Sequence, residues 1–301
     1  MNRENTPPDV ECPVCGATGY RELFRCTDHF LTGETFPLLS CSTCGFLMTG
    51  SPPPEETIGK YYQSEDYISH SQTPRGVVDR IYHLVRRVMA GRKAALVARS
   101  AGITEGALLD IGAGTGFFLD TMRRRGCQVT GTEPGESARQ VALEQHGITL
   151  LPAEGLFSIP QRAFDVITLW HVLEHLHDPG RYWQEFRRLL RPGGTLVIAL
   201  PNPASHDAAH YGAFWAAWDV PRHLWHFSPA NLGKMAEQYG FRLTQSYRMP
   251  FDSFYVSILS EKYKKASLPL LRGLWFGFRS WADAQARKQK CSSLIYVLKF
   301  E

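Results

Sequence analysis

The chain has 301 residues, a length that favours two domains over one. Apolar residues make up 44% of it and charged residues 21%, which excludes a mostly disordered chain. The formal net charge of +4 is well below that of a dedicated nucleic-acid-binding protein. No run of about 18 uncharged apolar residues is present, and the first residues lack an apolar signal core, so we expect a cytoplasmic protein.

Four of the seven cysteines form two Cys-x-x-Cys pairs, each followed by glycine: Cys12 with Cys15, and Cys41 with Cys44. Two such turns can complete a tetrahedral zinc site, and four thiolates leave no open position for catalysis. Residues 1–50 are therefore predicted to form a small zinc ribbon that binds structural Zn²⁺, with Cys26 and His29 as second-choice ligands. This segment has three basic and six acidic residues, which disfavours nucleic acid as a partner.

Beyond the ribbon, three consecutive prolines at positions 52–54 interrupt the chain. Residues 75–100 have apolar side chains at helical spacing, and we assign residues 51–104 to a lid segment and a helical connector. From residue 107 onward, short apolar runs alternate with amphipathic stretches. The predicted strands are 107–111, 128–131, 164–170, 195–200, 241–247 and 293–300, and the predicted helices are 117–122, 137–146, 179–190 and 229–239. This alternation predicts an α/β fold with a parallel sheet covered by helices on both faces.

The most informative motif is a glycine-rich turn after the first of these strands, Asp110-Ile-Gly112-Ala-Gly114-Thr-Gly116. Such glycines let the backbone approach a ligand at the carboxyl end of a strand. Asp110 would repel a pyrophosphate and suits a cationic ligand, and Glu133 after the next strand can accept two hydrogen bonds from a ribose diol. Together these two acids describe S-adenosylmethionine better than NAD. The alternatives are a tight turn without a ligand and a solvated surface acid.

With these residues, the chain over about 105–301 resembles the S-adenosylmethionine-dependent methyltransferases with the Rossmann-like fold. Three more motifs carry the resemblance: Thr132-Glu133-Pro134, the segment from Phe164 to Pro179, and the segment from Leu189 to Asn202. The resemblance implies a seven-stranded sheet in the order 3-2-1-4-5-7-6, with the last strand antiparallel. The cofactor contacts that it implies are Asp110, Gly112, Ala113, Gly114, Gly116, Glu133, Pro134, Ala153, Glu154, Trp170 and His171. Pro152 departs from the family pattern, because many members place an acid there that meets the adenine amine.

Histidines and one glutamate follow the fourth and fifth strands, at the expected active-site edge. They are His171, Glu174, His175 and His223. Methyl transfer needs alignment and exclusion of water, and a base helps when the acceptor is a hydroxyl or a carbon acid. We expect His223 to be the base or a substrate ligand. As alternatives, these histidines are packed without a chemical role, or the four side chains hold a divalent metal that lowers the pKa of an acceptor hydroxyl.

Two further segments take their predicted roles from the resemblance. The segment from Asp219 to Ser228 is similar to the Asp…His…Phe-Ser segment of sugar C-methyltransferases that carry an N-terminal zinc ribbon, in which the matching histidine is proposed as base. The segment from Tyr61 to Tyr67 is expected to cover the cofactor, or alternatively to pack between the ribbon and the main domain.

Between strands six and seven the chain inserts some forty residues, assigned to 251–290. Residues 261–290 combine a net charge of +6 with interleaved leucine, tryptophan and phenylalanine. A substrate cap or a homodimer contact is favoured, with peripheral membrane or apolar-substrate contact as the alternative.

These observations predict an S-adenosylmethionine-dependent methyltransferase acting at O or C of a small-molecule acceptor. A sugar nucleotide, a polyketide-like intermediate or a lipid-linked metabolite would fit, in the cytoplasm or at the inner face of the membrane. The alternatives are an RNA methyltransferase that uses the ribbon to bind substrate and a non-catalytic cofactor-binding protein.

Overall fold

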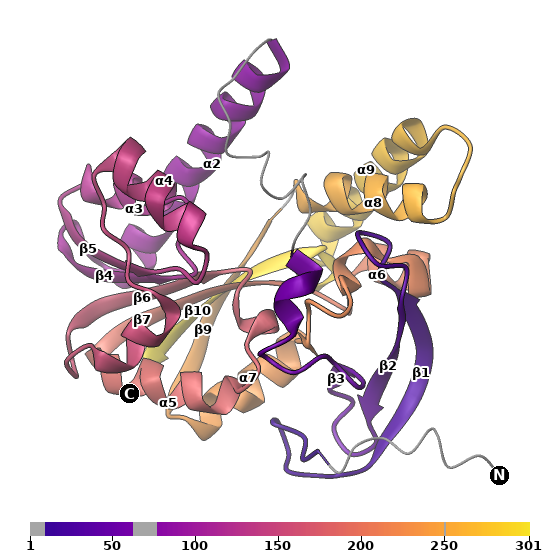
Figure 1. Cartoon of the computed structure of the whole chain (residues 1–301), viewed down its shortest axis with the longest axis horizontal. Coiled ribbons are helices and arrows are strands. Elements are labelled where there is room, and N and C mark those ends of the chain that lie inside the picture. The colour runs from indigo at the N-terminus through magenta and orange to yellow at the C-terminus, as the bar shows by residue number, and fades with distance from the viewer. Residues whose placement is uncertain (1–9, 63–76, 250) are drawn as a thin grey trace.

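The structure is a computed structural model that describes residues 10–62, 77–249 and 251–301, without the side chains of residues 77–86. Its centre is a six-stranded sheet in the order β5-β4-β6-β7-β10-β9 (Figure 1). In that order the strands are Cys127–Thr132, Gly106–Ile111, Phe164–Trp170, Leu190–Pro201, Ser293–Phe300 and Phe241–Arg248. The central strand β6 is mostly buried, as the continuous apolar run at 164–170 predicts, and so is β7 from residue 194 to residue 200.

The strand directions follow the prediction, but the number of strands does not. Strands β5, β4, β6 and β7 are parallel, and the last strand β10 is antiparallel to both of its neighbours. The expected outermost strand is reduced to a single bridge between Thr132 and Leu151, so the sheet of the described residues has six strands and not seven. Pro152 follows at once and cannot donate a ladder hydrogen bond, and a 3-10 turn begins at Ala153.

Helices cover both faces of this sheet. In Figure 1 the helices α2, α3 and α4 lie on one side of the sheet, and α5 and α7 lie on the other. Their bounds are Val77–Ala101, Phe117–Arg123, Glu136–His146, Pro179–Leu189 and Pro229–Gln238. Helices α5 and α7 begin in the same way, with a capping side chain (Asp178 or Ser228) and a proline in the first turn.

A second, antiparallel sheet contains the N-terminal segment. Strands β1 (Tyr20–Thr27), β2 (Thr35–Cys41) and β3 (Leu47–Thr49) are joined by β8 (Trp225–His226), which comes from the loop after β7. The buried cores of the two sheets also form one continuous apolar cluster. The N-terminal sheet is thus completed by the segment that carries the predicted catalytic histidine.

The insertion folds as a helical hairpin between β9 and β10. Helix α8 covers Asp252–Tyr263 and helix α9 covers Pro269–Ala286, and both lie near the short helix α6 (His206–Tyr211) in Figure 1. The two helices approach closely, because a Cβ atom added to Gly273 would lie 2.4 Å from the Cα of Ile258. None of the described helices is both long and apolar enough to cross a bilayer.

Candidate active site

The glycine turn after β4 presents backbone to the carboxyl edge of the sheet. Gly112 and Gly114 have φ angles of 70° and 55°, in the left-handed region that disfavours other residues. A Cβ on Gly112 would lie 2.5 Å from a methyl group of Val172, so only glycine fits there. The N–H groups of Gly112 and Ala113 both donate to the carbonyl of Thr132 at 2.9 Å, which holds the turn against the end of β5.

The carboxylate of Glu133 lies directly over this turn. One oxygen accepts from the N–H of Gly114 at 2.9 Å, and the other accepts from the N–H of Gly135 at 3.0 Å. The N–H of Glu133 itself donates to Leu151. That bond brings the remaining predicted residues of this edge to the same place, namely Pro134, Ala153 and Glu154. The structure therefore brings these predicted cofactor residues together, and a contact between Glu133 and a ribose stays a prediction.

Asp110 lies beneath the turn rather than at its surface. It is 1% exposed and accepts a hydrogen bond of 2.5 Å from the hydroxyl of Thr168. Burial raises the pKa of Asp110 to about 7, although Thr168 and Lys93 act in the opposite direction. Lys93 reaches in from α2, and its amine lies 4.3 Å from the ring centroid of Trp170. The sequence carries no signal that marks Lys93, which is one of several basic residues in that helix.

His171 follows the last residue of β6 and has a strained backbone conformation, with a φ of 58°. One ring nitrogen lies 3.4 Å from Glu174 and the other lies 3.6 Å from Asp252 of α8. Burial favours the neutral ring, but the two carboxylates outweigh it and raise the pKa of His171 above its ordinary value. The insertion thus contributes a carboxylate to this edge, which the sequence analysis did not predict.

Glu174, His175 and His223 form a compact cluster in which the ligand atoms all lie within 4.8 Å of one another. Glu174 and His175 belong to a short 3-10 turn after β6, and the rings of His175 and His223 are 4.6 Å apart. Glu174 is 1% exposed, and neither of its oxygens has a hydrogen-bond partner among the described residues. Burial, together with the nearby His223, lowers the pKa of His175 to about 4. That ring is therefore neutral near pH 7.

Hydrogen bonds fix the tautomers of the two rings. The Nδ1 of His223 lies 2.9 Å from the carbonyl oxygen of Ala217, and the Nδ1 of His175 lies 3.0 Å from that of Arg222. A carbonyl oxygen only accepts, so both Nδ1 atoms carry hydrogen, and Nε2 is the nitrogen of each ring that can accept a proton or bind a metal. The hydroxyl of Tyr62 also lies 3.0 Å from the Nδ1 of His175. Tyr62 belongs to the predicted lid, of which residues 63–67 lie outside the described residues.

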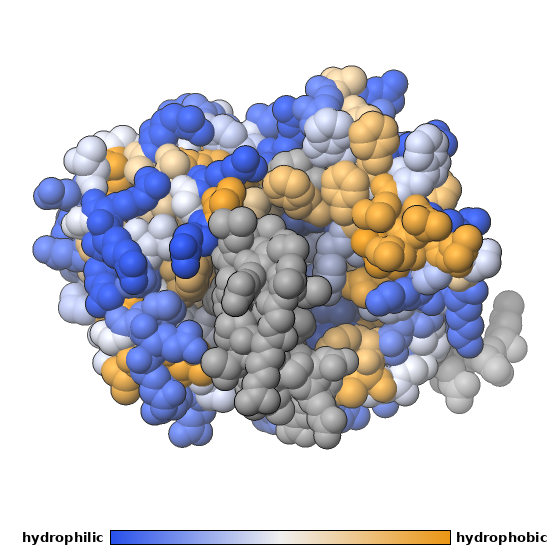
Figure 2. Space-filling view, turned by 90° about the horizontal axis from the view of Figure 1, so that it is seen from above, coloured by the Kyte–Doolittle hydropathy of each residue, from blue (hydrophilic) through white to orange (hydrophobic). Residues whose placement is uncertain are grey.

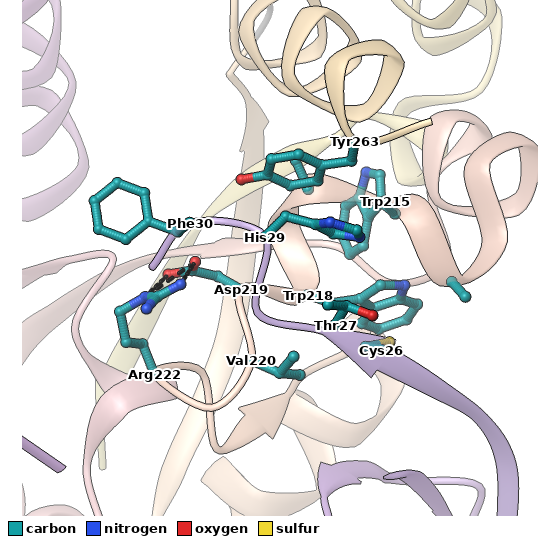
Figure 3. A pocket seen from close by; sticks show the side chains of 12 residues that line it. Cys26, Thr27, His29, Phe30, Trp215, Trp218, Asp219, Val220, Arg222 and Tyr263 are labelled. Atoms are coloured by element: carbon teal, nitrogen blue, oxygen red, sulfur yellow. Dashed lines mark hydrogen bonds and ion pairs between the residues drawn. The ribbon is translucent and has the colours of Figure 1, made fainter. Parts of the chain in front are cut away.

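A buried ion network that the sequence analysis missed anchors the loop before His223. Arg222 contacts Asp219 at 2.7 Å and Asp28 of the N-terminal segment at 2.9 Å. Figure 3 shows Arg222 and Asp219 on one side of a small cavity lined by aromatic rings such as Tyr263. The cavity measures about 10 Å³, enough for one water molecule. The spacing of Asp219 and Arg222 was a possible signal, but nothing in the sequence marks Asp28 as their partner.

The four cysteines of the two Cys-x-x-Cys turns meet at one point. Their sulfurs lie within 4.8 Å of one another, and Cys12–Cys44 and Cys15–Cys41 are each 3.6 Å apart. Zinc bound at 2.3 Å to four thiolates would place the sulfurs about 3.8 Å apart, so this donor set fits structural zinc. The second-choice ligands Cys26 and His29 are not part of this group. They line the cavity in Figure 3 instead.

The sheet, the glycine turn and the acid at the end of β5 are those of S-adenosylmethionine-dependent methyltransferases with a Rossmann-like fold. A family model described as a methyltransferase domain matches residues 82–246, more than half of the chain. The chain therefore belongs to this methyltransferase family, and the protein is an S-adenosylmethionine-dependent methyltransferase.

Relatives and solved structures agree with this assignment. The chain is 35% identical to a ubiquinone biosynthesis O-methyltransferase of Aeromonas salmonicida over 156 residues, which cover 47% of this chain and 65% of the relative. It is 29% identical to the protein of that name from Pseudomonas aeruginosa over 180 residues, covering 56% and 75%. The matched region thus spans slightly less than two thirds of the Aeromonas protein. Both relatives carry the name O-methyltransferase and not sugar C-methyltransferase.

Two solved structures share the fold. The magnesium protoporphyrin IX methyltransferase of Synechocystis with bound SAH has a TM-score of 0.54 at 11% identity, covering 82% of this chain and all of that one. A putative sarcosine dimethylglycine methyltransferase from Galdieria sulphuraria has a TM-score of 0.51 at 16% identity, covering 70% and 85%.

Proposed function

We propose that this methyltransferase acts on a hydroxyl oxygen of a small-molecule acceptor. The observation that carries the proposal is the cluster of Glu174, His175 and His223, since a hydroxyl must lose its proton as it is methylated. The cluster belongs to the same edge of the sheet as the glycine turn, because Val172, two residues before Glu174, packs against Gly112. The names of the relatives also favour oxygen over carbon. A sugar nucleotide, a polyketide-like intermediate and a lipid-linked metabolite remain the acceptor classes that fit.

The residues of the glycine turn fit S-adenosylmethionine, which would supply an electrophilic methyl group. Gly112, Gly114 and the carboxylate of Glu133 would hold its methionine and ribose portions at the edge of the sheet. The acceptor oxygen forms the new O–CH₃ bond while the S–CH₃ bond breaks and its electron pair stays on sulfur. The hydroxyl proton passes to the Nε2 of His223, because the Nδ1 of that ring already donates its hydrogen to the carbonyl of Ala217.

A transfer assay with labelled S-adenosylmethionine and a panel of phenols, sugar nucleotides and polyketide-like hydroxyls tests this function. Mass spectrometry of the product should locate the label on oxygen. His223→Gln should lower kcat about 100-fold or more with KM little changed, whereas His206→Gln, a change at a half-exposed histidine of α6, should behave as wild type. Label on carbon or in RNA would contradict the proposal, and so would full activity of His223→Gln.

The N-terminal segment is proposed to bind one structural zinc ion through Cys12, Cys15, Cys41 and Cys44. The sulfur spacing described above and the burial of Cys12 and Cys41 support this. Elemental analysis of purified protein should find one zinc per chain. The double substitution Cys12→Ser and Cys44→Ser should abolish it, and the matched change Cys127→Ser at a buried cysteine elsewhere should not.

A further inference from the structure

We propose that Glu174, His175 and His223 form a binding site for a divalent first-row metal cation such as Co²⁺ or Mn²⁺. The binding of the cation does not depend on the proposed function. Only the catalytic use of the cation rests on that function. A cation at this site would stabilise the acceptor oxygen while the hydroxyl proton leaves to water. In that state His223 is a ligand and no longer the base.

The buried carboxylate of Glu174, which has an ion-pair contact with His171 but no hydrogen bond among the described residues, is the first observation that points to a cation. A buried polar group without a hydrogen bond is destabilising, and an ionised one more so. The ring of His171 lies 3.4 Å from one oxygen, too far for a good hydrogen bond. Both oxygens of Glu174 therefore retain free lone pairs, and one of these oxygens lies within 4.8 Å of a ring nitrogen of each of the two histidines.

The hydrogen bonds of the histidines are the second observation. Rings that bind a metal usually donate their other N–H to a carbonyl or carboxylate, which fixes the tautomer and the orientation of the ring. His175 and His223 each make such a bond through Nδ1, to two different backbone carbonyls. Two imidazoles and one carboxylate are a ligand set that leaves coordination positions open for water or substrate.

Cobalt titration into protein that carries one equivalent of zinc, enough for the four cysteines alone, tests the site without acceptor or methyl transfer. Wild type should bind one Co²⁺ per chain, with visible d–d absorption and without the near-ultraviolet charge-transfer band of a thiolate site. Glu174→Gln and His223→Gln should each weaken Co²⁺ by roughly 100-fold or more, and His206→Gln should bind as wild type. Equal affinity for SAH in all four proteins would show that the substituted chains are folded.

Other results would overturn the metal site. These are the absence of Co²⁺ binding by wild type, a spectrum with thiolate bands only, or affinities that the two substitutions leave unchanged. Failure of the proposed function has a different signature, namely normal Co²⁺ binding with no transfer of label to any hydroxyl.

A separate observation concerns the surface of α9, whose apolar side chains face outward. Its buried positions are small, namely Gly273, Gly277, Ser280 and Ala284. The two glycines pack on α8, and the hydroxyl of Ser280 donates to Asp207 of α6. Its large apolar residues are exposed, with Leu268, Leu270, Leu271, Leu274, Trp275 and Phe278 between 42% and 67% accessible. Figure 2 shows orange side chains gathered at the end of the molecule where α8 and α9 lie. We call these six residues the α9 patch.

We infer that the α9 patch binds the surface of an anionic lipid membrane. Exposed basic residues border it, namely Lys262, Lys264, Lys265, Arg272 and Arg279, of which Arg272 also pairs with Glu261. A symmetric contact between two copies would bring these cations together, whereas anionic headgroups neutralise them. Only the side chains of the α9 patch would enter the bilayer. This mode of binding needs no helix that crosses the membrane, and none is found among the described residues.

Flotation with phosphatidylcholine vesicles, with and without about 30% phosphatidylglycerol, tests this surface. Wild type should float with the anionic vesicles. The double substitution Leu271→Ser and Trp275→Ser should reduce partitioning about tenfold or more, while Leu143→Ser, at an exposed leucine of α4, should not. No flotation of wild type would overturn the inference, as would a dimer in light scattering that the double substitution converts to monomer.

Discussion

Arg222 provides the sharpest test of how the two sheets are held together. Its side chain is 5% exposed, and it contacts Asp28, which is fully buried, as well as Asp219. Removing one partner from a buried pair typically costs 3–5 kcal/mol, because the other charge is left unpaired. Asp28 also accepts from the N–H groups of residues 30–32 and from the hydroxyl of Thr32, so part of its charge stays compensated.

We therefore expect Arg222→Met to lower the free energy of unfolding by about 3 kcal/mol, at the low end of that range. Thermal and urea unfolding would measure this loss, with a melting temperature roughly 6–12 °C lower. The matched change Arg242→Met removes an ion pair with Glu301 that is 62–65% exposed, and should cost less than about 1 kcal/mol. Equal stability of the two variants would refute this account, as would strict additivity of Arg222→Met with Asp28→Asn.

Three other changes separate the roles assigned above. Burial raises the pKa of Asp110 from 3.8 to about 7, so the folded chain favours the protonated carboxyl. The contribution of this group to the free energy of unfolding is therefore complete below about pH 4 and is lost as the pH rises to 7. Asp110→Asn should remove a slope of about 1.4 kcal/mol per pH unit from unfolding curves between pH 5 and 7, and an unchanged slope would assign it to other groups. Glu133→Gln should weaken SAH about 10–100-fold in calorimetry, because the amide cannot accept from both Gly114 and Gly135, while Glu144→Gln, at an exposed glutamate of α4, should bind nearly normally. Cys44→Ser should lower the melting temperature and abolish the effect of added zinc on it; a zinc-dependent shift that persists would place the metal elsewhere.

The sequence was sufficient where local patterns decide the structure. The buried strand at 164–170 and the strand at 293–300 were predicted with their observed limits, because their apolar runs mark them directly. The loss of the outermost strand was not predicted, because the seven-stranded sheet was taken from the resemblance to the family. The missing N–H of Pro152 was a signal against a strand there. The positions of His175 and His223 after two of the predicted strands were also sufficient to predict that both lie at the same edge of the sheet.

Long-range partners were beyond the reach of the sequence. Strand β8 has only two residues, and its pairing with β3 depends on chain segments nearly 180 positions apart. The same holds for the contact of Arg222 with Asp28, since neither residue is distinguished from an ordinary surface charge by its neighbours in the sequence. The absence of a hydrogen bond to the Glu174 carboxylate is likewise a property of packing, because it depends on which donors the fold brings near a buried carboxylate.

These long-range contacts argue for a role of the N-terminal sheet at the active site. The hydroxyl of Thr49 donates to the carbonyl of His223 at 2.6 Å, and β3 pairs directly with the strand that follows this histidine. A buried ion pair such as Arg222–Asp28 gains little stability over apolar packing, but it permits only one alignment of the two segments. We infer that the N-terminal sheet holds the loop that carries His223 and thereby fixes the position of this histidine. Its acidic composition and its burial against the methyltransferase domain both disfavour a separate role in binding nucleic acid.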